Sequence, residues 1–433
     1  MQKFILPLHL AALLVCPLAV AAEAPASATS PLAATSPLRA LSLSAAVQRA
    51  LAANREISAA RHGLDVSAGA LLQAGLRPNP ELGITVEDAG RADNRSTTVQ
   101  ITQALELAGK RPARIALAQS EAAIANNELA IKAAEIRATA TRGFFDVLIA
   151  EERRRLARHS FDLARKVRET TAKQVASGKI SAIEETKAGV AESGIRIELS
   201  QADSALLAAR QRLAANWGAR QADDFELSGS FDDLPELPSM VALSERLRAA
   251  ATMQRVRLAV EQGQANLQLE RSRRIPDLSV SLGAKREAET GRQQALVAIA
   301  IPLPWSDRNQ GNVQQASARL NQARDQLAVS ESLLYSQLQQ IHQRLSVALD
   351  EHSLLEREIL PGAQRAFEMT LKGFEYGKFN FIDVSDAQRS LLLAQAQHLR
   401  SLSDAHQAAS EIESLLADPA LSLYSTMQTK DTL

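Results

Sequence analysis

The chain has 433 residues, and its 49 basic and 49 acidic side chains give a formal net charge of zero. Nucleic-acid binding requires a basic surface, and only 3% of the residues are aromatic, which also disfavours stacking on bases. We therefore expect no nucleic-acid partner. The only cysteine, Cys16, lies near the N-terminus, so the rest of the chain cannot form a disulfide.

Residues 1–22 predict a secretory signal peptide, because a basic residue precedes an apolar run and a small-residue cleavage site ends near Ala21 or Ala22. We therefore expect an exported protein. Lipidation at Cys16 is an alternative, but Val15 is larger than the residue expected before an acylated cysteine.

Residues 23–42 are rich in alanine, serine, threonine and proline, and this composition predicts a flexible leader. Beyond the signal, no segment approaches the roughly 20 apolar residues of a membrane-spanning helix. Any membrane crossing is therefore expected to use β-strands.

The chain contains a long-range internal repeat. Matching segments lie 196 to 199 positions apart: 80–84 with 276–280, 101–105 with 299–303, and 175–184 with 374–383. This near-constant offset predicts an internal duplication of one structural unit. The predicted repeats are residues 43–217 and 239–417, with a linker at 218–238 and a C-terminal tail at 418–433.

Each predicted repeat begins with a helix and continues with a pair of strands. The helices, at 43–76 and 239–274, must end at Pro78 and Pro276. The following segments alternate apolar and polar residues, which is the period of a strand with two different faces. The predicted strands cover residues 81–87, 98–107, 278–282 and 297–303, with polar links at 88–96 and 285–294.

A globular sandwich could also use four such strands. Four strands cannot close a barrel, however, since about eight is the smallest common number. Three chains with four strands each are the simplest closed arrangement.

A very long helix follows each strand pair, at residues 110–176 and 308–375. Each would extend roughly 100 Å at 1.5 Å per residue, too long for a compact domain. In the first, two sets of apolar or small residues recur every seven positions on different faces, which predicts two neighbouring helices. These sets are Leu117, Ile124, Ile131 and Ala138, and Ala122, Leu129, Ile136 and Gly143. A helix buried in a bundle is the alternative.

Both long helices end at a Gly-Lys pair, at Gly178 and Gly377, where glycine suits the left-handed residue of a helix end. Helix resumes at about 180–217 and 379–417. The two shorter helices of each half total roughly 105 to 110 Å, so they can stack end to end along the long helix. Pro361-Gly362 predicts a kink in the second long helix.

Several motifs resemble the TolC-like outer-membrane factor family over nearly the whole chain after the signal. Residues 376–391 are similar to the family's C-terminal signature. Residues 78–82, 86–88, 105–111 and 177–181 are similar to its CzcC-type branch, which serves heavy-metal efflux.

The resemblance implies a mainly α fold with a small β part. It implies a homotrimer whose twelve-stranded barrel lies in outer-membrane lipid and continues as a twelve-helix periplasmic tunnel. The implied partners are a periplasmic adaptor and an inner-membrane pump of the resistance-nodulation-division type. The implied function is a passive duct for cobalt, zinc, cadmium or nickel cations; alternatives are drug efflux, type I secretion or a coiled-coil adaptor.

The resemblance also suggests the residues of two sites. Asp383, Asp386, Phe374 and Phe379 match the pore constriction, where the aromatic pair replaces the tyrosine and arginine of family prototypes. Gly178, Lys179, Glu184, Gly377 and Lys378 match the periplasmic tip that docks the adaptor, and Glu185 holds a comparable position. The alternative is that the four carboxylates are ordinary helix N-terminal charges.

No enzyme motif, cofactor site or tight metal site is expected. The sequence contains no phosphate-binding glycine loop and no nucleophile elbow. The histidines after the signal show no metal-ligand spacing and are interpreted as scattered surface residues. They are His62, His159, His342, His352, His398 and His406.

Overall fold

The computed structural model describes residues 40–221, 225–419 and 421–424. The predicted signal peptide, Cys16 and all but the last three residues of the predicted leader lie outside these ranges. Within the described ranges, none of the helices is long and apolar enough to cross a membrane.

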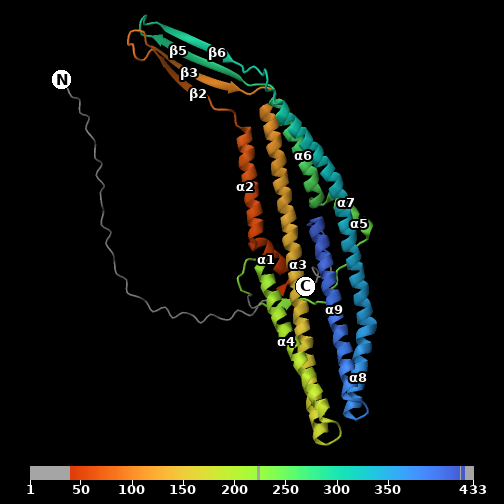
Figure 1. Cartoon of the computed structure of the whole chain (residues 1–433). Coiled ribbons are helices and arrows are strands. Elements are labelled where there is room, and N and C mark those ends of the chain that lie inside the picture. Colours follow the sequence, from red (N-terminus) through yellow and green to blue (C-terminus); the bar gives the residue numbers. More distant parts are fainter. Residues whose placement is uncertain (1–39, 222–224, 420, 425–433) are drawn as a thin grey trace, which may run out of the picture. The chain divides into compact units, whose positions relative to one another are not determined.

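The described chain is mainly helical, and its two halves contain helices and strands in a similar order (Figure 1). The first half contains β1 (Leu41–Ser42), α1 (Leu43–Ala53), α2 (Arg55–Gly75), β2 (Glu81–Glu87), β3 (Ser96–Leu105), α3 (Lys110–Ala176) and α4 (Ala182–Ala215). The second contains β4 (Leu227–Ser228), α5 (Met240–Ala249), α6 (Ala251–Ser272), β5 (Leu278–Glu287), β6 (Gln293–Ala300), α7 (Gln310–Leu354), α8 (Leu360–Glu375) and α9 (Phe381–Leu416).

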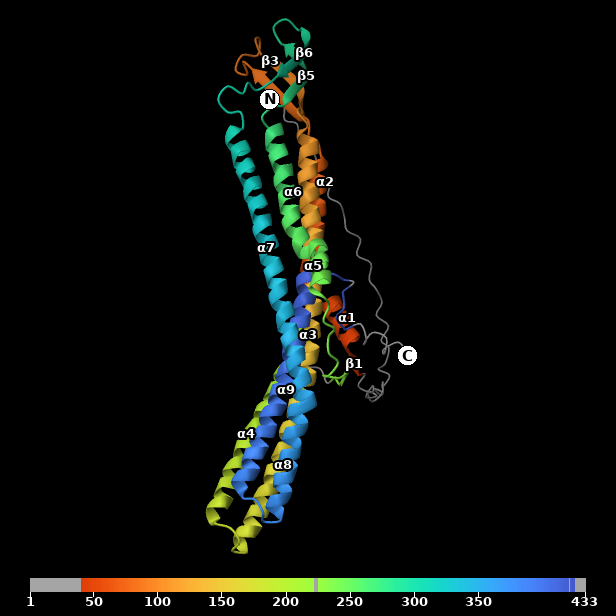
Figure 2. The ribbon, with the colours of Figure 1, turned by 90° about the vertical axis from the view of Figure 1, so that its right-hand side faces the viewer.

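Shorter helices line each long helix, as predicted. Helices α1, α2 and α4 pack along α3, while α5, α6 and α9 pack along α7 and α8 (Figures 1 and 2). Among the helices, the two halves touch mainly where α3 packs on α6 and α9. The sheet lies at one end of these helices, and the α3–α4 and α8–α9 turns lie at the other.

The two predicted rows of apolar residues on α3 face different neighbours. Leu129 and Ile136 pack with Ile57 and other residues of α1 and α2. Ile131 packs with Ala251 of α6 and Ala417 at the end of α9. The two-sided packing predicted from the heptad spacing is therefore confirmed for α3.

The first helix of each half is broken, which the sequence analysis missed. Asn54 separates α1 from α2 in an extended conformation, and its side chain caps α2 through Glu56 N and reaches Asn216 O at 2.9 Å. Ala250 separates α5 from α6 in the same conformation. Asparagine is a common cap, but alanine gives no such signal.

The second long helix is interrupted near Pro361-Gly362, where the sequence predicts a kink. A π-helical segment, Leu355–Ile359, lies between α7 and α8, and Pro361 follows in the first turn of α8. Proline cannot donate a helical hydrogen bond, and the wider π turn accommodates this irregularity. α3 has no such segment and runs unbroken over 67 residues.

The largest core lies midway along the helices, where the linker and the tail pack. Phe144 and Phe145 of α3 meet Leu345 and Ile412, together with Leu423 and Tyr424 of the tail. β1 pairs with β4 of the linker in parallel, so the last two residues of the predicted leader are ordered. No sequence pattern had indicated that the tail or the leader packs on the helices.

Candidate functional site: a two-faced sheet and a helical tip

The four longer strands form one antiparallel sheet in the order β2-β3-β5-β6. β3 and β5 join the two halves, with Leu105 opposite Leu278. The predicted strands are present, but β6 ends at Ala300, so Ile301 and Leu303 lie outside it. Pro302 and Pro304 follow, and proline cannot continue a strand ladder.

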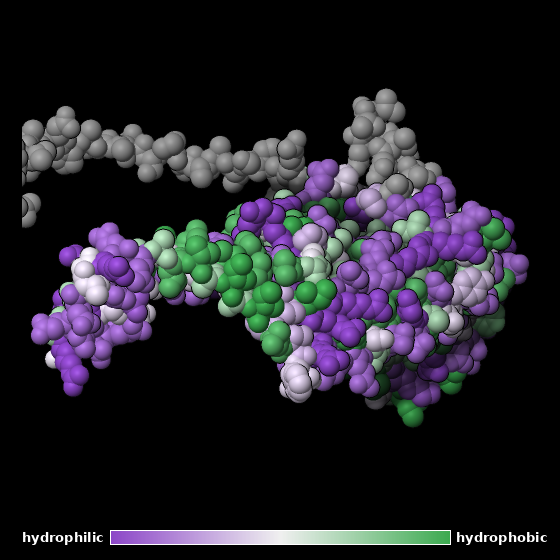
Figure 3. Space-filling view, turned by 90° about the horizontal axis from the view of Figure 1, so that it is seen from above, coloured by the Kyte–Doolittle hydropathy of each residue, from purple (hydrophilic) through white to green (hydrophobic). Residues whose placement is uncertain are grey.

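One face of the sheet is apolar and exposed. The strand register places Leu82, Ile101, Leu282 and Val297 side by side across all four strands. These four side chains are 55–69% exposed. Figure 3 shows the corresponding hydrophobic band between hydrophilic loops and the helical part. Such a patch on a monomer marks a surface that binds lipid or another protein.

The opposite face carries mostly polar or small side chains. Thr102 Oγ1 and Ser281 Oγ lie 2.8 Å apart across β3 and β5. Near the loops, Glu87 accepts hydrogen bonds from Ser96 at 2.7 Å and from Lys285 at 3.0 Å. The alternating sequence predicted this two-faced character, whereas these contacts depend on strand pairing that local sequence does not specify.

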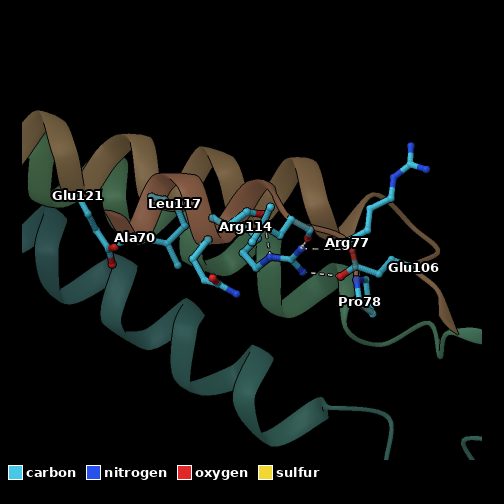
Figure 4. A pocket seen from close by; sticks show the side chains of 11 residues that line it. Ala70, Arg77, Pro78, Glu106, Arg114, Leu117 and Glu121 are labelled. Atoms are coloured by element: carbon cyan, nitrogen blue, oxygen red, sulfur yellow. Dashed lines mark hydrogen bonds and ion pairs between the residues drawn. The ribbon is translucent and has the colours of Figure 1, made fainter. Parts of the chain in front are cut away.

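Charged side chains fasten the sheet to the helices. The Arg114 guanidinium pairs with Glu106 after β3, and it also donates to Ala74 O and Leu76 O at the end of α2 (Figure 4). Lys110 Nζ lies 2.6 Å from Asp277 Oδ1, which joins the two halves. The motif at residues 105–111 indicated the family resemblance but not this structural role.

The two Gly-Lys turns have the same backbone geometry. Gly178 and Gly377 adopt left-handed φ values of 73° and 70°, as predicted. In the first turn Lys179 N donates to Gln174 O, and in the second Lys378 N donates to Gly373 O, at 3.0 and 2.8 Å. With the accompanying bond from each glycine N, these are Schellman motifs, which satisfy carbonyls at a helix end. Both lysines are exposed.

The structure gives the two tip aspartates different surroundings. Asp383 forms a capping box with Asn380, in which each side chain accepts from the other residue's backbone N–H at 3.0 Å. Asp386 is exposed one turn further along α9. Asp383 therefore caps the start of α9, which agrees with the alternative interpretation of this carboxylate as a helix N-terminal charge.

The two predicted pore phenylalanines differ in exposure. Phe374 is only 2% exposed and packs with Val167, Phe367 and Val384 in the core of the tip. Phe379 is 49% exposed, and its ring lies against Gly373, where an added Cβ would approach it to 2.1 Å. Of these two phenylalanines, only Phe379 presents its ring to the surface of the single chain.

The tip also contains an ion-pair cluster that was missed. Glu192 is buried on α4 and accepts from Arg168 of α3 at 2.6 Å and from Arg196 at 3.1 Å. The hydrogen bond from Arg168 lowers the pKa of Glu192. Glu184, a predicted docking residue, pairs with Lys187 at 2.9 Å, and Glu185 is exposed.

The interpretation of all histidines as surface residues was wrong for His352 and His406. They are 5% and 1% exposed, respectively. His406 stacks on Phe145 with ring centroids 3.7 Å apart and contacts Tyr424 Oη at 3.0 Å and Phe231 O at 3.1 Å. Burial lowers the pKa of His406 to about 4. No local sequence pattern indicated this burial, because the contacts come from α3, the linker and the tail.

The remaining described histidines differ from these two. His62 is exposed beside Asp65, His159 is exposed on α3, and His342 Nε2 lies 3.0 Å from Pro238 O. His398 is half-buried, and burial lowers its pKa. Among the described residues, no three His, Cys, Asp or Glu side chains are already arranged to hold one metal ion.

Comparison with known proteins agrees with this architecture. The family model described as outer membrane efflux protein matches residues 46–219 and again 242–418. The cobalt-zinc-cadmium resistance protein CzcC of Cupriavidus metallidurans is 40% identical over 353 residues, which cover 82% of this chain and 84% of the relative. The nickel-cobalt-cadmium resistance protein NccC of Alcaligenes xylosoxydans xylosoxydans is 27% identical over 58% of this chain and 57% of its own.

Solved structures show the same fold at low sequence identity. CusC aligns with a TM-score of 0.74 at 16% identity and covers 88% of this chain and 92% of its own. VceC from Vibrio cholerae aligns with a TM-score of 0.72 at 18% identity and covers 87% and 96%. Because the family model matches most of the chain in two segments, the chain belongs to the outer membrane efflux protein family.

Proposed function

We propose that the chain is one subunit of an outer-membrane channel that exports heavy-metal cations as a passive duct. The observation that carries the channel proposal is the two-faced sheet. Its exposed apolar face suits lipid, and its opposite face, on which Gln100, Thr102, Ser281 and Gly283 lie, suits a water-filled lumen.

We infer that three copies form the channel. One chain supplies a four-stranded sheet whose outer strands, β2 and β6, have free edges within the described chain. Unpaired edges are unfavourable in lipid, so membrane strands close into barrels. Three four-stranded sheets form a twelve-stranded barrel, and the helices then form a twelve-helix periplasmic tunnel. The matching order of elements in the two halves supports an origin by duplication.

The tip is the proposed docking surface for a periplasmic adaptor, which links the channel to an inner-membrane pump of the resistance-nodulation-division type. The two Schellman turns lie at the end of the helices opposite the sheet (Figure 1). Gly178, Lys179, Gly377 and Lys378 are exposed there, with Glu184 half-buried close by. Equivalent turns in both halves would offer an adaptor six similar contacts in a trimer.

We propose a pore constriction at the start of α9. Asp386 and Asp383 are exposed on one helix face, so three copies would place six carboxylates around the axis. A ring of carboxylates attracts cations. Phe379, with its exposed ring, is the better candidate for apolar closure, since Phe374 is covered by the tip core.

The proposed cargo comes from the relatives. CzcC, a cobalt-zinc-cadmium resistance protein, is 40% identical to this chain over more than four fifths of both proteins. NccC is a nickel-cobalt-cadmium resistance protein, so nickel joins the candidate cations. Cargo selection by the pump would leave the channel with only a weak requirement for specificity.

A complementation experiment tests this function. A strain that keeps the matching adaptor and pump but lacks this chain should lose tolerance to cobalt, zinc, cadmium or nickel, and the chain should restore it. Tolerance to organic drugs and secretion of a type I substrate serve as controls. Recovery of either control without recovery of metal tolerance would contradict the proposed cargo.

A further inference from the structure

We infer that helix α4 of one copy packs against α7 and α8 of the next copy through rows of apolar side chains that a single chain leaves exposed. The partner of this surface is therefore a second copy of this chain. The contact rests on the proposed assembly of three copies, and it names the helix faces that would meet there. It lies between the middle of the molecule and the tip, apart from the sheet (Figure 1).

Helix α4 has two rows of apolar side chains on opposite faces, and the members of each row lie seven positions apart. The inner row is at most 7% exposed where α4 packs along α3, and it contains Ala188, Ile195, Ala202 and Ala209. The outer row is offset by two positions, which turn a helix by about 200°. Its members point away from the inner row and are 58–68% exposed: Ile183, Val190 and Ile197. One chain therefore leaves an apolar row of α4 on its surface.

Helices α7 and α8 carry a similar pair of rows. The inner row is at most 5% exposed, and it contains Leu338, Leu345, His352, Phe367 and Phe374. The outer row is again offset by two positions, so it points away from the inner row. Its members, which end at the C-cap of α8, are 49–82% exposed: Val347, Leu354, Met369 and Tyr376. An apolar row therefore lies open on this side of the chain as well.

The π-helical segment keeps the outer row of α7 and α8 on one face. On either side of the segment the row advances by seven positions, but the step from Leu354 to Gly362 is eight. The segment Leu355–Ile359 lies within this step. A π turn holds about one residue more than an α turn, so it absorbs the extra residue. Met369 and Tyr376 therefore stay in line with the row on α7.

The two outer rows lie on opposite edges of the helical part. α3 packs on α4 and α9, and α9 packs on α8, so α4 and α8 are the outer helices near the tip (Figures 1 and 2). The ion pair of Arg168 joins α3 to α4, and Gln174 Nε2 of α3 donates to Phe374 O of α8 at 3.5 Å. Counted along the helices from these contacts, Val190 and Met369 lie at nearly the same distance from the tip.

A second copy fits these two rows. In a ring of helices each member has neighbours on two opposite sides, and the outer row of each edge helix faces the side where the next copy must lie. Opposite edges that meet make a head-to-tail contact, which can close into a ring. Equal spacing by seven positions lets the two rows interdigitate, as in a coiled coil. An adaptor outside the ring would instead reach the faces between the two rows.

Cysteine cross-linking in isolated membranes tests this contact. Cys16, in the predicted signal peptide, is the only cysteine, so introduced thiols can be paired selectively. In the Val190→Cys Met369→Cys double variant, oxidation should join most copies into reducible species of two and three chains. A disulfide requires Cα atoms within about 7 Å, which packed helices at the same height provide. Each single variant should stay as one chain, since a head-to-tail contact does not bring identical positions together.

Leu207→Cys combined with Met369→Cys is the matched control. Leu207 is also exposed on α4 but lies about 25 Å further from the tip than Val190, so this pair should not cross-link. Light scattering in detergent gives the mass of the same samples. A trimer without the Val190–Met369 cross-link would overturn the contact and leave the channel proposal intact, whereas a soluble monomer would contradict the channel itself. Protection of the Val190→Cys thiol from maleimide only when the adaptor is present would assign this face to the adaptor instead.

Discussion

At the scale of single residues, His406 shows how segments distant in sequence pack together in the middle of the molecule. Its ring stacks on Phe145 of α3, one ring nitrogen contacts Tyr424 Oη of the tail, and the other contacts Phe231 O of the linker. Burial keeps the imidazole neutral, with a pKa of about 4. Burial also raises the pKa of Tyr424. One side chain thus joins three parts of the chain.

We expect His406 to make stability depend on pH. Its pKa is lower in the folded chain than its ordinary value of 6.5, so its contribution is complete above pH 6.5 and is lost as pH falls towards 4. The slope should reach about 1.4 kcal/mol per pH unit for each chain. His406→Phe should flatten this slope in thermal unfolding, whereas His62→Phe, at an exposed position, should keep it. An unchanged slope in His406→Phe would contradict the assignment.

At the scale of elements, the sequence predicted the long helices and turns better than the breaks between helices. α3 ends at Ala176, as predicted, because Gly178 forms a left-handed turn just after it. The break at Ala250 could not be predicted, since alanine favours helix and only tertiary packing ends α5 there. The apolar-polar alternation identified both sheet faces, but burial of Phe374 and His352 depends on helices distant in sequence.

The two Schellman turns should determine whether the tip can dock the adaptor. An added Cβ at Gly178 or Gly377 meets no atom within 4 Å, so only the left-handed backbone opposes substitution. That conformation costs a residue with a Cβ about 1–2 kcal/mol, and more for a β-branched one. Gly178→Val and Gly377→Val should therefore lower metal tolerance while outer-membrane assembly persists.

Asparagine provides the matched control at these turns, because it tolerates the left-handed conformation. Gly178→Asn and Gly377→Asn should keep nearly normal metal tolerance. Growth in graded cobalt or zinc, with immunoblots of membrane fractions, measures both effects. Normal tolerance in both valine variants would count against the tip as the docking site.

At the scale of the whole molecule, the exposed apolar face requires partners that one chain does not contain. We expect membrane extraction only with detergent, and a mass of three chains by light scattering. Ile84→Lys, on the apolar face of β2, should reduce trimer yield, because a charge on the lipid face costs about 2–4 kcal/mol near the bilayer centre. Thr85→Lys, on the other face, should assemble. A monomer released without detergent would contradict this model.

Three-fold assembly would also turn isolated surface charges into a ring. Asp386 is exposed, and the Asp383 side chain, one turn away, accepts from Asn380 N, so replacement with asparagine removes charge while preserving size and a capping oxygen. In planar bilayers, the Asp383→Asn Asp386→Asn double variant should show weaker cation selectivity and weaker block by multivalent cations. Asp404→Asn, further along α9 and beside Arg400, is the matched control and should behave as the unaltered channel does. If the double variant retains full selectivity, these carboxylates only stabilise the helix start, and the constriction lies elsewhere.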